Sequence, residues 1–172
     1  MKSVLISIRP KWVEMIASGK KTLELRKNFP ALELPFKCYI YCTKGNLSYK
    51  VPGGMICHNN DGMVVVGEFV CDKIEHIEIR HFTVFGHENR YTAVGDNPDR
   101  KWLAHSCLDY NEVAQYGKLA PLYGWHISEL KIYDKPKSLG EFNHCGQNYH
   151  FNPPITRPPQ SWCYVEEGGC NE

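Results

Sequence analysis

Apolar and polar residues alternate over several short stretches of this chain, a pattern typical of β-strands that bury one face. The stretch 63–71 is more continuously apolar, as expected for a buried strand, and its Gly67 indicates a bulge or a close approach of another backbone. The segment 74–84 is also expected to be extended. The strands predicted from alternation or continuous apolar character are 4–8, 22–26, 36–43, 63–71, 123–133 and 161–165.

Helical spacing of apolar residues is confined to three stretches. The first begins at Pro10, which suits the first turn of a helix, and runs to about Ser18. Shorter helices are expected at 101–106 and 111–116, the second capped by Asp109. Short strands with few helices predict an α+β, mostly β, fold built as a small barrel with one early helix. Loops or insertions are expected at 44–62, 86–98 and 145–159.

Composition narrows the class of protein. The 172 residues suit one domain with a real core, and no run approaches the roughly 20 apolar residues of a membrane span. The first residues are too few and too polar for a signal peptide, so a cytoplasmic protein without membrane contact is expected. The eight cysteines contain no CxxC pair, so we interpret them as reduced thiols and expect neither a disulfide nor a zinc site.

Charge is unevenly distributed although the formal net charge is only +1. Residues 1–50 hold ten Lys and Arg but three acidic residues. Such asymmetry is compatible with a local basic surface that faces an anion, and equally with chance on a mixed surface. No glycine-rich phosphate-loop or dinucleotide motif occurs, so no cofactor is expected.

The most informative stretch is 19–26, where a helix end is followed at once by a charged strand. Gly19 suits the residue after a helix because it tolerates positive φ. With a period of two, Glu24 and Arg26 share one face of the strand, and Leu23 and Leu25 share the other. The polar face could form an ion pair on a solvated edge, or it could line a cleft.

The motif Gly19-x-Lys21-x-x-Glu24-x-Arg26 resembles the GxKxxExR signature of ASCH domains, which belong to the PUA-like β-barrels. Its context agrees: a strand ending in Arg9-Pro10 leads into the preceding helix. The resemblance covers roughly 3–133, with a C-terminal extension and closing strand at 134–166, so that 1–172 is one domain. The tail 157–164 is similar to endings seen in bacterial and phage members.

The resemblance implies a cleft beside the helix that binds RNA or a nucleotide-like ligand. One branch of the family removes the acyl group from N4-acetylcytidine, and ribonuclease activity is attributed to others. Lys21 matches the catalytic lysine of the deacylating branch, but Glu24 stands where that branch has a threonine. In the deacylating branch, the catalytic carboxylate comes from a later helix, and Glu112 is a positional guess for it in this sequence. His126 is a weaker candidate for a general base.

Several residues could contact such a ligand. Lys21 and Arg26 suit a phosphate or a carbonyl, and Glu24 could accept from the amino edge of cytosine or guanine. Trp125 and Trp162 could stack on a base or pack in the core. The full set of candidate ligand-binding residues is Ser7, Arg9, Gly19, Lys21, Glu24, Arg26, Trp125 and Trp162.

Three functions therefore stay open at this point. The first is a domain that binds RNA, a nucleoside or a nucleotide without chemistry. The second is a hydrolase acting on RNA or a modified nucleoside amide, with Lys21 and Glu24 as catalytic residues. The third is a regulatory protein-interaction domain whose cleft has lost its ligand.

Overall fold

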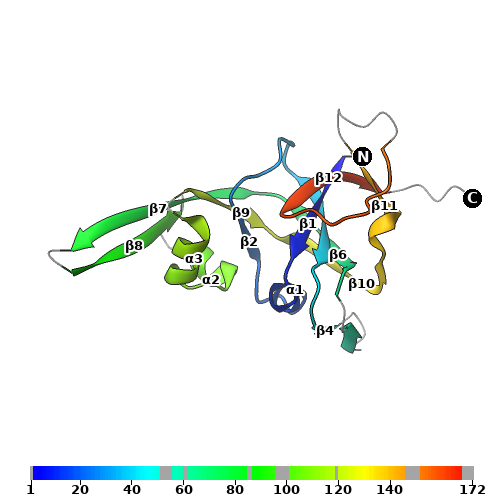
Figure 1. The fold of residues 1–172 in the computed structure, drawn as a ribbon, viewed down its shortest axis with the longest axis horizontal. Coiled ribbons are helices and arrows are strands. Elements are labelled where there is room, and N and C mark those ends of the chain that lie inside the picture. The colour runs from blue at the N-terminus through cyan, green and yellow to red at the C-terminus, as the bar shows by residue number, and fades with distance from the viewer. Residues whose placement is uncertain are drawn as a thin grey trace, which may run out of the picture.

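A computed structural model describes residues 2–50, 56–59, 62–84, 87–95, 101–118, 120–145 and 152–167. The described part is α+β and mostly β, as the alternation predicted (Figure 1). The elements are β1 Ser3–Ile8, α1 Pro10–Ala17, β2 Leu23–Arg26, β3 Phe36–Cys42, β4 Leu47–Lys50, β5 Ile56–Asn59, β6 Val64–Cys71, β7 Ile74–Val84, β8 His87–Gly95, α2 Lys101–Ser106, α3 Tyr110–Gly117, β9 Leu122–His126, β10 Ser128–Lys137, the 3-10 helix η1 Leu139–Glu141, β11 Phe142–His144 and β12 Trp162–Glu167.

The larger sheet has six strands in the order β10-β6-β3-β1-β12-β11. β1 pairs in parallel with β3 and antiparallel with β12. Its side chains are buried on both faces: Ile6 packs into the core cluster that includes α1, and Leu5 packs on the opposite face beside Tyr39. An all-buried strand needs neighbours on both edges as well, which explains its position inside the sheet.

The smaller sheet has the order β2-β9-β7-β8 (Figure 1). β7 and β8 form a long antiparallel ribbon that projects from the body of the molecule. The sequence predicted a polar insertion over 86–98, and this was wrong for 87–95, which is β8. The loop predicted over 44–62 likewise contains the paired strands β4 and β5.

The predicted strand 123–133 is two strands that belong to different sheets. β9 pairs with β2 and β7, whereas β10 pairs with β6. The chain bends between them, where Ile127 lies outside both strands and Glu129 has a φ of 47°. The chain therefore passes from the smaller sheet to the larger one at this bend.

The helices lie on different parts of the core. α1 buries Val13 and Ile16 in the core beneath the larger sheet. α2 and α3 pack on the opposite side, where Trp102 and Val113 enclose Leu23. None of the helices in the described ranges is long and apolar enough to cross a membrane.

Candidate functional site

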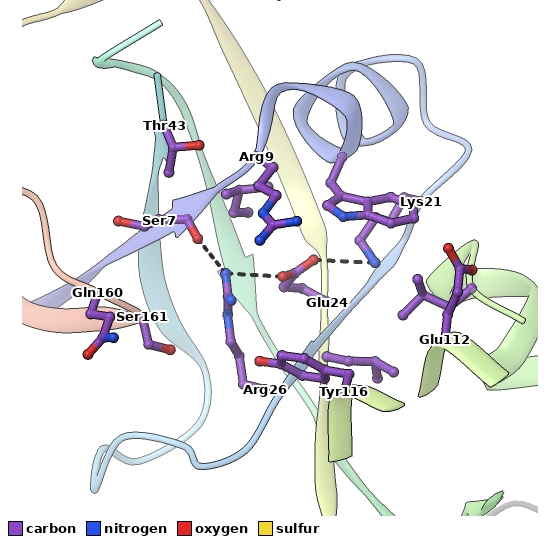
Figure 2. A pocket seen from close by; sticks show the side chains of 14 residues that line it. Ser7, Arg9, Lys21, Glu24, Arg26, Thr43, Glu112, Tyr116, Gln160 and Ser161 are labelled. Atoms are coloured by element: carbon purple, nitrogen blue, oxygen red, sulfur yellow. Dashed lines mark hydrogen bonds and ion pairs between the residues drawn. The ribbon is translucent and has the colours of Figure 1, made fainter. Parts of the chain in front are cut away.

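A pocket of about 400 Å³ opens between α1, β2, α3 and the segment before β12 (Figure 2). α1 and the end of β1 supply one wall, α3 supplies the opposite wall, and β2 forms the floor. The lining residues are Ser7, Ile8, Arg9, Trp12, Lys21, Glu24, Leu25, Arg26, Thr43, Leu108, Glu112, Tyr116, Gln160 and Ser161.

The alternation of β2 directs its charges to this pocket. Leu23 and Leu25 pack against α2 and α3 in one core cluster. Glu24 and Arg26, on the other face, line the pocket with Lys21 from the turn after α1. That turn is tight because Gly19 adopts a φ of 74°, which costs glycine little. Gly19 itself lies outside the pocket lining.

Lys21 is buried, with 2% of its surface exposed, and its ammonium has three acceptors. It donates to the carbonyl oxygens of Leu23 at 2.8 Å and Ser106 at 2.7 Å. Its third contact is Glu24 Oε2 at 3.3 Å. The ammonium therefore makes two hydrogen bonds and one ion pair, all within the protein. Lys21 thus holds the site together in this arrangement.

The Glu24 carboxylate lies between two cations. Oε2 contacts Lys21, and Oε1 contacts Arg26 Nη2 at 3.1 Å. Figure 2 shows the two cations approaching from opposite sides, which leaves the front of the carboxylate turned toward the pocket. The side chain is only 7% exposed, so the carboxylate forms a pre-oriented acceptor at the floor.

Arg26 links the floor to the rim. Its Nη2 also donates to the backbone oxygen of Ser7 at 2.7 Å. Its buried Nε has no hydrogen-bond partner among the residues that the structure describes. The Ser7 hydroxyl donates to Pro159 O at 2.6 Å, and Ser7 N donates to Ser161 O at 2.9 Å. These contacts hold the segment before β12 against the pocket, which Gln160 and Ser161 line (Figure 2).

Arg9 differs from the two buried cations. It is exposed, and its guanidinium has no ion pair or hydrogen bond to any other residue that the structure describes. Figure 2 shows it pointing into the pocket, across from the front of Glu24. Arg9 is held there by the corner between β1 and α1, where it forms the N-cap of the helix.

Two aromatic rings line the pocket, and the sequence analysis did not include either among the site residues. Trp12 comes from α1 and Tyr116 from α3. Both are half-buried. The exposed ammonium of Lys11 lies 4.3 Å from the Trp12 ring centre, and that of Lys27 lies 5.4 Å from the Tyr116 ring centre. Trp12 lies one helical turn after Arg9, so the two residues lie on the same side of the helix. This spacing is the signal in the sequence that could have identified Trp12 as a site residue.

The two tryptophans proposed for stacking do not line the pocket. Trp125 is fully buried and packs between Phe36, at 5.8 Å between ring centroids, and Trp162, at 6.0 Å. Trp162 is half-buried and donates from Nε1 to Asn28 Oδ1 at 2.8 Å. The surroundings of both tryptophans therefore fit packing in the core, which the sequence analysis gave as the alternative to base stacking.

The candidate acid–base residues also have structural partners. Glu112 lines the pocket, but Oε2 of its carboxylate accepts from Asp109 N at 3.0 Å in the capping box of α3. His126 lies outside the pocket, with Nε2 at 3.4 Å from Glu75 Oε2. Within the described ranges, no group of three or more His, Cys, Asp or Glu residues could hold a metal ion.

The fold, α+β and mostly β, is similar to that of solved ASCH structures. ASCH from Zymomonas mobilis matches with a TM-score of 0.55 and 18% identity, over 95% of this chain and 87% of its own. Two of its variants, one with tyrosine changed to phenylalanine and one with serine changed to alanine, match with TM-scores of 0.57 at 17% identity. They cover 96% and 95% of this chain and 91% and 88% of theirs. No family model and no curated protein matches.

Proposed function

We propose that this protein binds RNA or a nucleotide, and that the base enters the pocket between α1, β2 and α3. The observation that carries the proposal is the Glu24 carboxylate, fixed by Lys21 and Arg26 at the floor of a pocket with aromatic walls. A base has a flat apolar face and a polar edge. The rings of Trp12 and Tyr116 suit the face, and a fixed carboxylate suits donors on the edge.

The surroundings of the pocket also suit a phosphate. Lys11 and Lys27 are exposed, and each lies over one of the aromatic walls. A base between those walls would bring its sugar and phosphate toward these two ammonium groups. Exposed lysines bind phosphate as point charges and require no fixed geometry.

Binding is better supported than hydrolysis. A lysine that acts as a base must release a proton and present a free lone pair, whereas the Lys21 ammonium donates to two carbonyl oxygens and forms an ion pair with Glu24. Glu112 is held in the cap of α3. The polar floor argues against a pocket without a ligand, because burying charges is costly when nothing uses them.

The test is calorimetric titration of the purified protein with the four ribonucleoside monophosphates and with short single-stranded RNA. Tyr116→Leu keeps an apolar side chain but removes the ring, and Tyr116→Phe keeps the ring as a matched control. If the ring stacks on a base, Tyr116→Leu should lower the affinity by about tenfold or more, whereas Tyr116→Phe should change it little. No binding by any of these ligands at millimolar concentration would contradict the proposal.

A further inference from the structure

We infer that the pocket selects guanine, recognising its Watson–Crick edge through Glu24 and Arg9; this inference rests on the proposed function. The starting point is the geometry of the carboxylate. Lys21 and Arg26 each contact a different oxygen, and they are the only partners of Glu24 among the residues that the structure describes. Both oxygens therefore keep acceptor capacity on the side that faces the pocket.

A carboxylate with two free acceptor positions in one plane requires two adjacent donors. Guanine offers N1–H and the 2-amino group side by side. Cytosine and adenine each place a ring nitrogen acceptor beside their amino group, so one carboxylate oxygen would face a lone pair. Uracil has a single donor, N3–H, between two carbonyl oxygens. Guanine alone among the four bases can satisfy both oxygens at once.

Arg9 supplies the third element of the match. Beside its two donors, guanine carries the acceptor O6 on the same edge. The Arg9 guanidinium points into the pocket from across Glu24 and has no partner among the described residues. No salt bridge joins Arg9 to Glu24, so its guanidinium stays available to an acceptor that lies beside the two donors on the same ligand edge. A cation beside a carboxylate complements the acceptor–donor–donor order of guanine and opposes the order of the other bases.

Ligand analogues test the inference without altering the protein. GMP is expected to bind about tenfold or more tightly than AMP, CMP or UMP, because a bidentate contact discriminates by that amount. Inosine monophosphate keeps N1–H and O6 but lacks the 2-amino group, and it should bind several-fold more weakly than GMP. 2-Aminopurine riboside monophosphate keeps the amino group but lacks O6 and N1–H, and it should bind more weakly still.

Two variants complete the experiment. Arg9→Ala should weaken GMP binding and reduce the preference for GMP over 2-aminopurine, and since Arg9 is exposed the fold should be unaffected. Glu24→Gln should remove the preference for GMP over AMP, because an amide offers one donor and one acceptor. That substitution leaves buried Lys21 without its carboxylate, so the analogue series on the unaltered protein is the deciding measurement.

The outcomes separate the two proposals. GMP preference with weaker inosine monophosphate supports both. Nucleotide binding with no preference for GMP, or with equal affinities for GMP and inosine monophosphate, overturns the guanine inference and leaves the proposed function standing. No binding by any nucleotide or RNA overturns both.

Discussion

The ammonium group of Lys21 donates to the backbone oxygen of Ser106 at 2.7 Å, a contact between residues 85 positions apart in the chain. It joins the start of β2 to the end of α2, beneath the pocket. Leu23 O is a second acceptor of this buried cation, and Glu24 is its ion-pair partner. The same side chain thus orients the Glu24 carboxylate and fastens a helix to the sheet.

Lys21→Ala should therefore destabilise the protein. It removes one partner of a buried ion pair and leaves two carbonyl oxygens without a donor, which together should lower the free energy of unfolding by about 3 kcal/mol. Urea unfolding followed by circular dichroism measures this. Lys20→Ala is the matched control: Lys20 is exposed, and its loss should change stability by less than about 0.5 kcal/mol. Equal stabilities of the two variants would contradict the structural role of Lys21.

Glu24 and Trp125 show what the sequence could and could not predict about the site. The two residues are directly paired across β2 and β9, so they share one face of the sheet. Alternation along 22–26 is a local property, and it correctly placed Glu24 and Arg26 together. Trp125 is covered by Phe36 and Trp162, which come from distant parts of the chain. Such long-range packing leaves no local pattern that a sequence reading can detect.

The fold shows the same difference between features set by local alternation and features set by long-range contacts. The buried strands β1 and β3 follow the apolar pattern of the sequence and were predicted to within about one residue at each end. β8 has the polar sequence HENRYTAVG and is held by pairing with β7, so no apolar alternation indicates it. The division of 123–133 between two sheets depends on whether β2 or β6 is the partner, which alternation alone does not specify.

Gly67 should tolerate no side chain. A Cβ added there would lie 2.5 Å from the backbone oxygen of Lys131 in the neighbouring strand β10. Since backbone cannot yield as a flexible side chain can, Gly67→Ala should cost about 1–3 kcal/mol of stability. Gly140→Ala is the control, because nothing lies within 4 Å of its added Cβ, and stability should be unchanged or slightly higher. Thermal unfolding of both variants decides, and a Gly67→Ala protein as stable as Gly140→Ala would refute the close approach.

Buried thiols should make stability fall at alkaline pH. Burial raises the pKa of Cys71 and of Cys42 from 9.0 to about 12, and it raises the pKa of Cys38 as well. Below pH 9 the thiols are protonated in both the folded and the unfolded chain, so this contribution is fully present. Above pH 9 the unfolded chain loses protons that the folded chain keeps, and the contribution is lost as pH rises toward 12.

The expected slope is about 1.4 kcal/mol per pH unit for each such thiol. Urea unfolding between about pH 7 and about pH 10 measures it. Cys71→Ala isolates one thiol, and its stability should fall less steeply with pH than that of the unaltered protein. Parallel pH profiles for the two proteins would show that the Cys71 pKa is not raised.

Hydrolysis of N4-acetylcytidine should be weak or absent. Position 24 carries a carboxylate and no hydroxyl nucleophile, and the Lys21 ammonium is held by two carbonyl oxygens and the Glu24 carboxylate. Glu112 is engaged in the α3 cap. Acetate release from N4-acetylcytidine should therefore stay close to that of buffer alone. Robust turnover that persists in Lys21→Ala would move attention to Glu112 or His126.

Binding of single-stranded RNA should be modest and sensitive to salt. Each lysine that contacts a phosphate releases counterions, and for single strands the logarithm of affinity falls by about 0.7 per contact for each tenfold rise in salt. Lys11 and Lys27 lie over the aromatic walls of the pocket, so they are the expected phosphate contacts. Fluorescence anisotropy of a labelled RNA at several salt concentrations measures the slope.

The double variant Lys11→Ala/Lys27→Ala should bind RNA more weakly and with a slope that is shallower by about 1.4. Lys135→Ala is the control, because Lys135 is an exposed lysine on β10, and β10 contributes nothing to the pocket lining. If the control and the double variant lose affinity equally, the charge acts through the whole surface and not at the pocket. If affinity does not change with salt in the unaltered protein, the ligand makes no phosphate contact, and the pocket takes a neutral nucleoside or none.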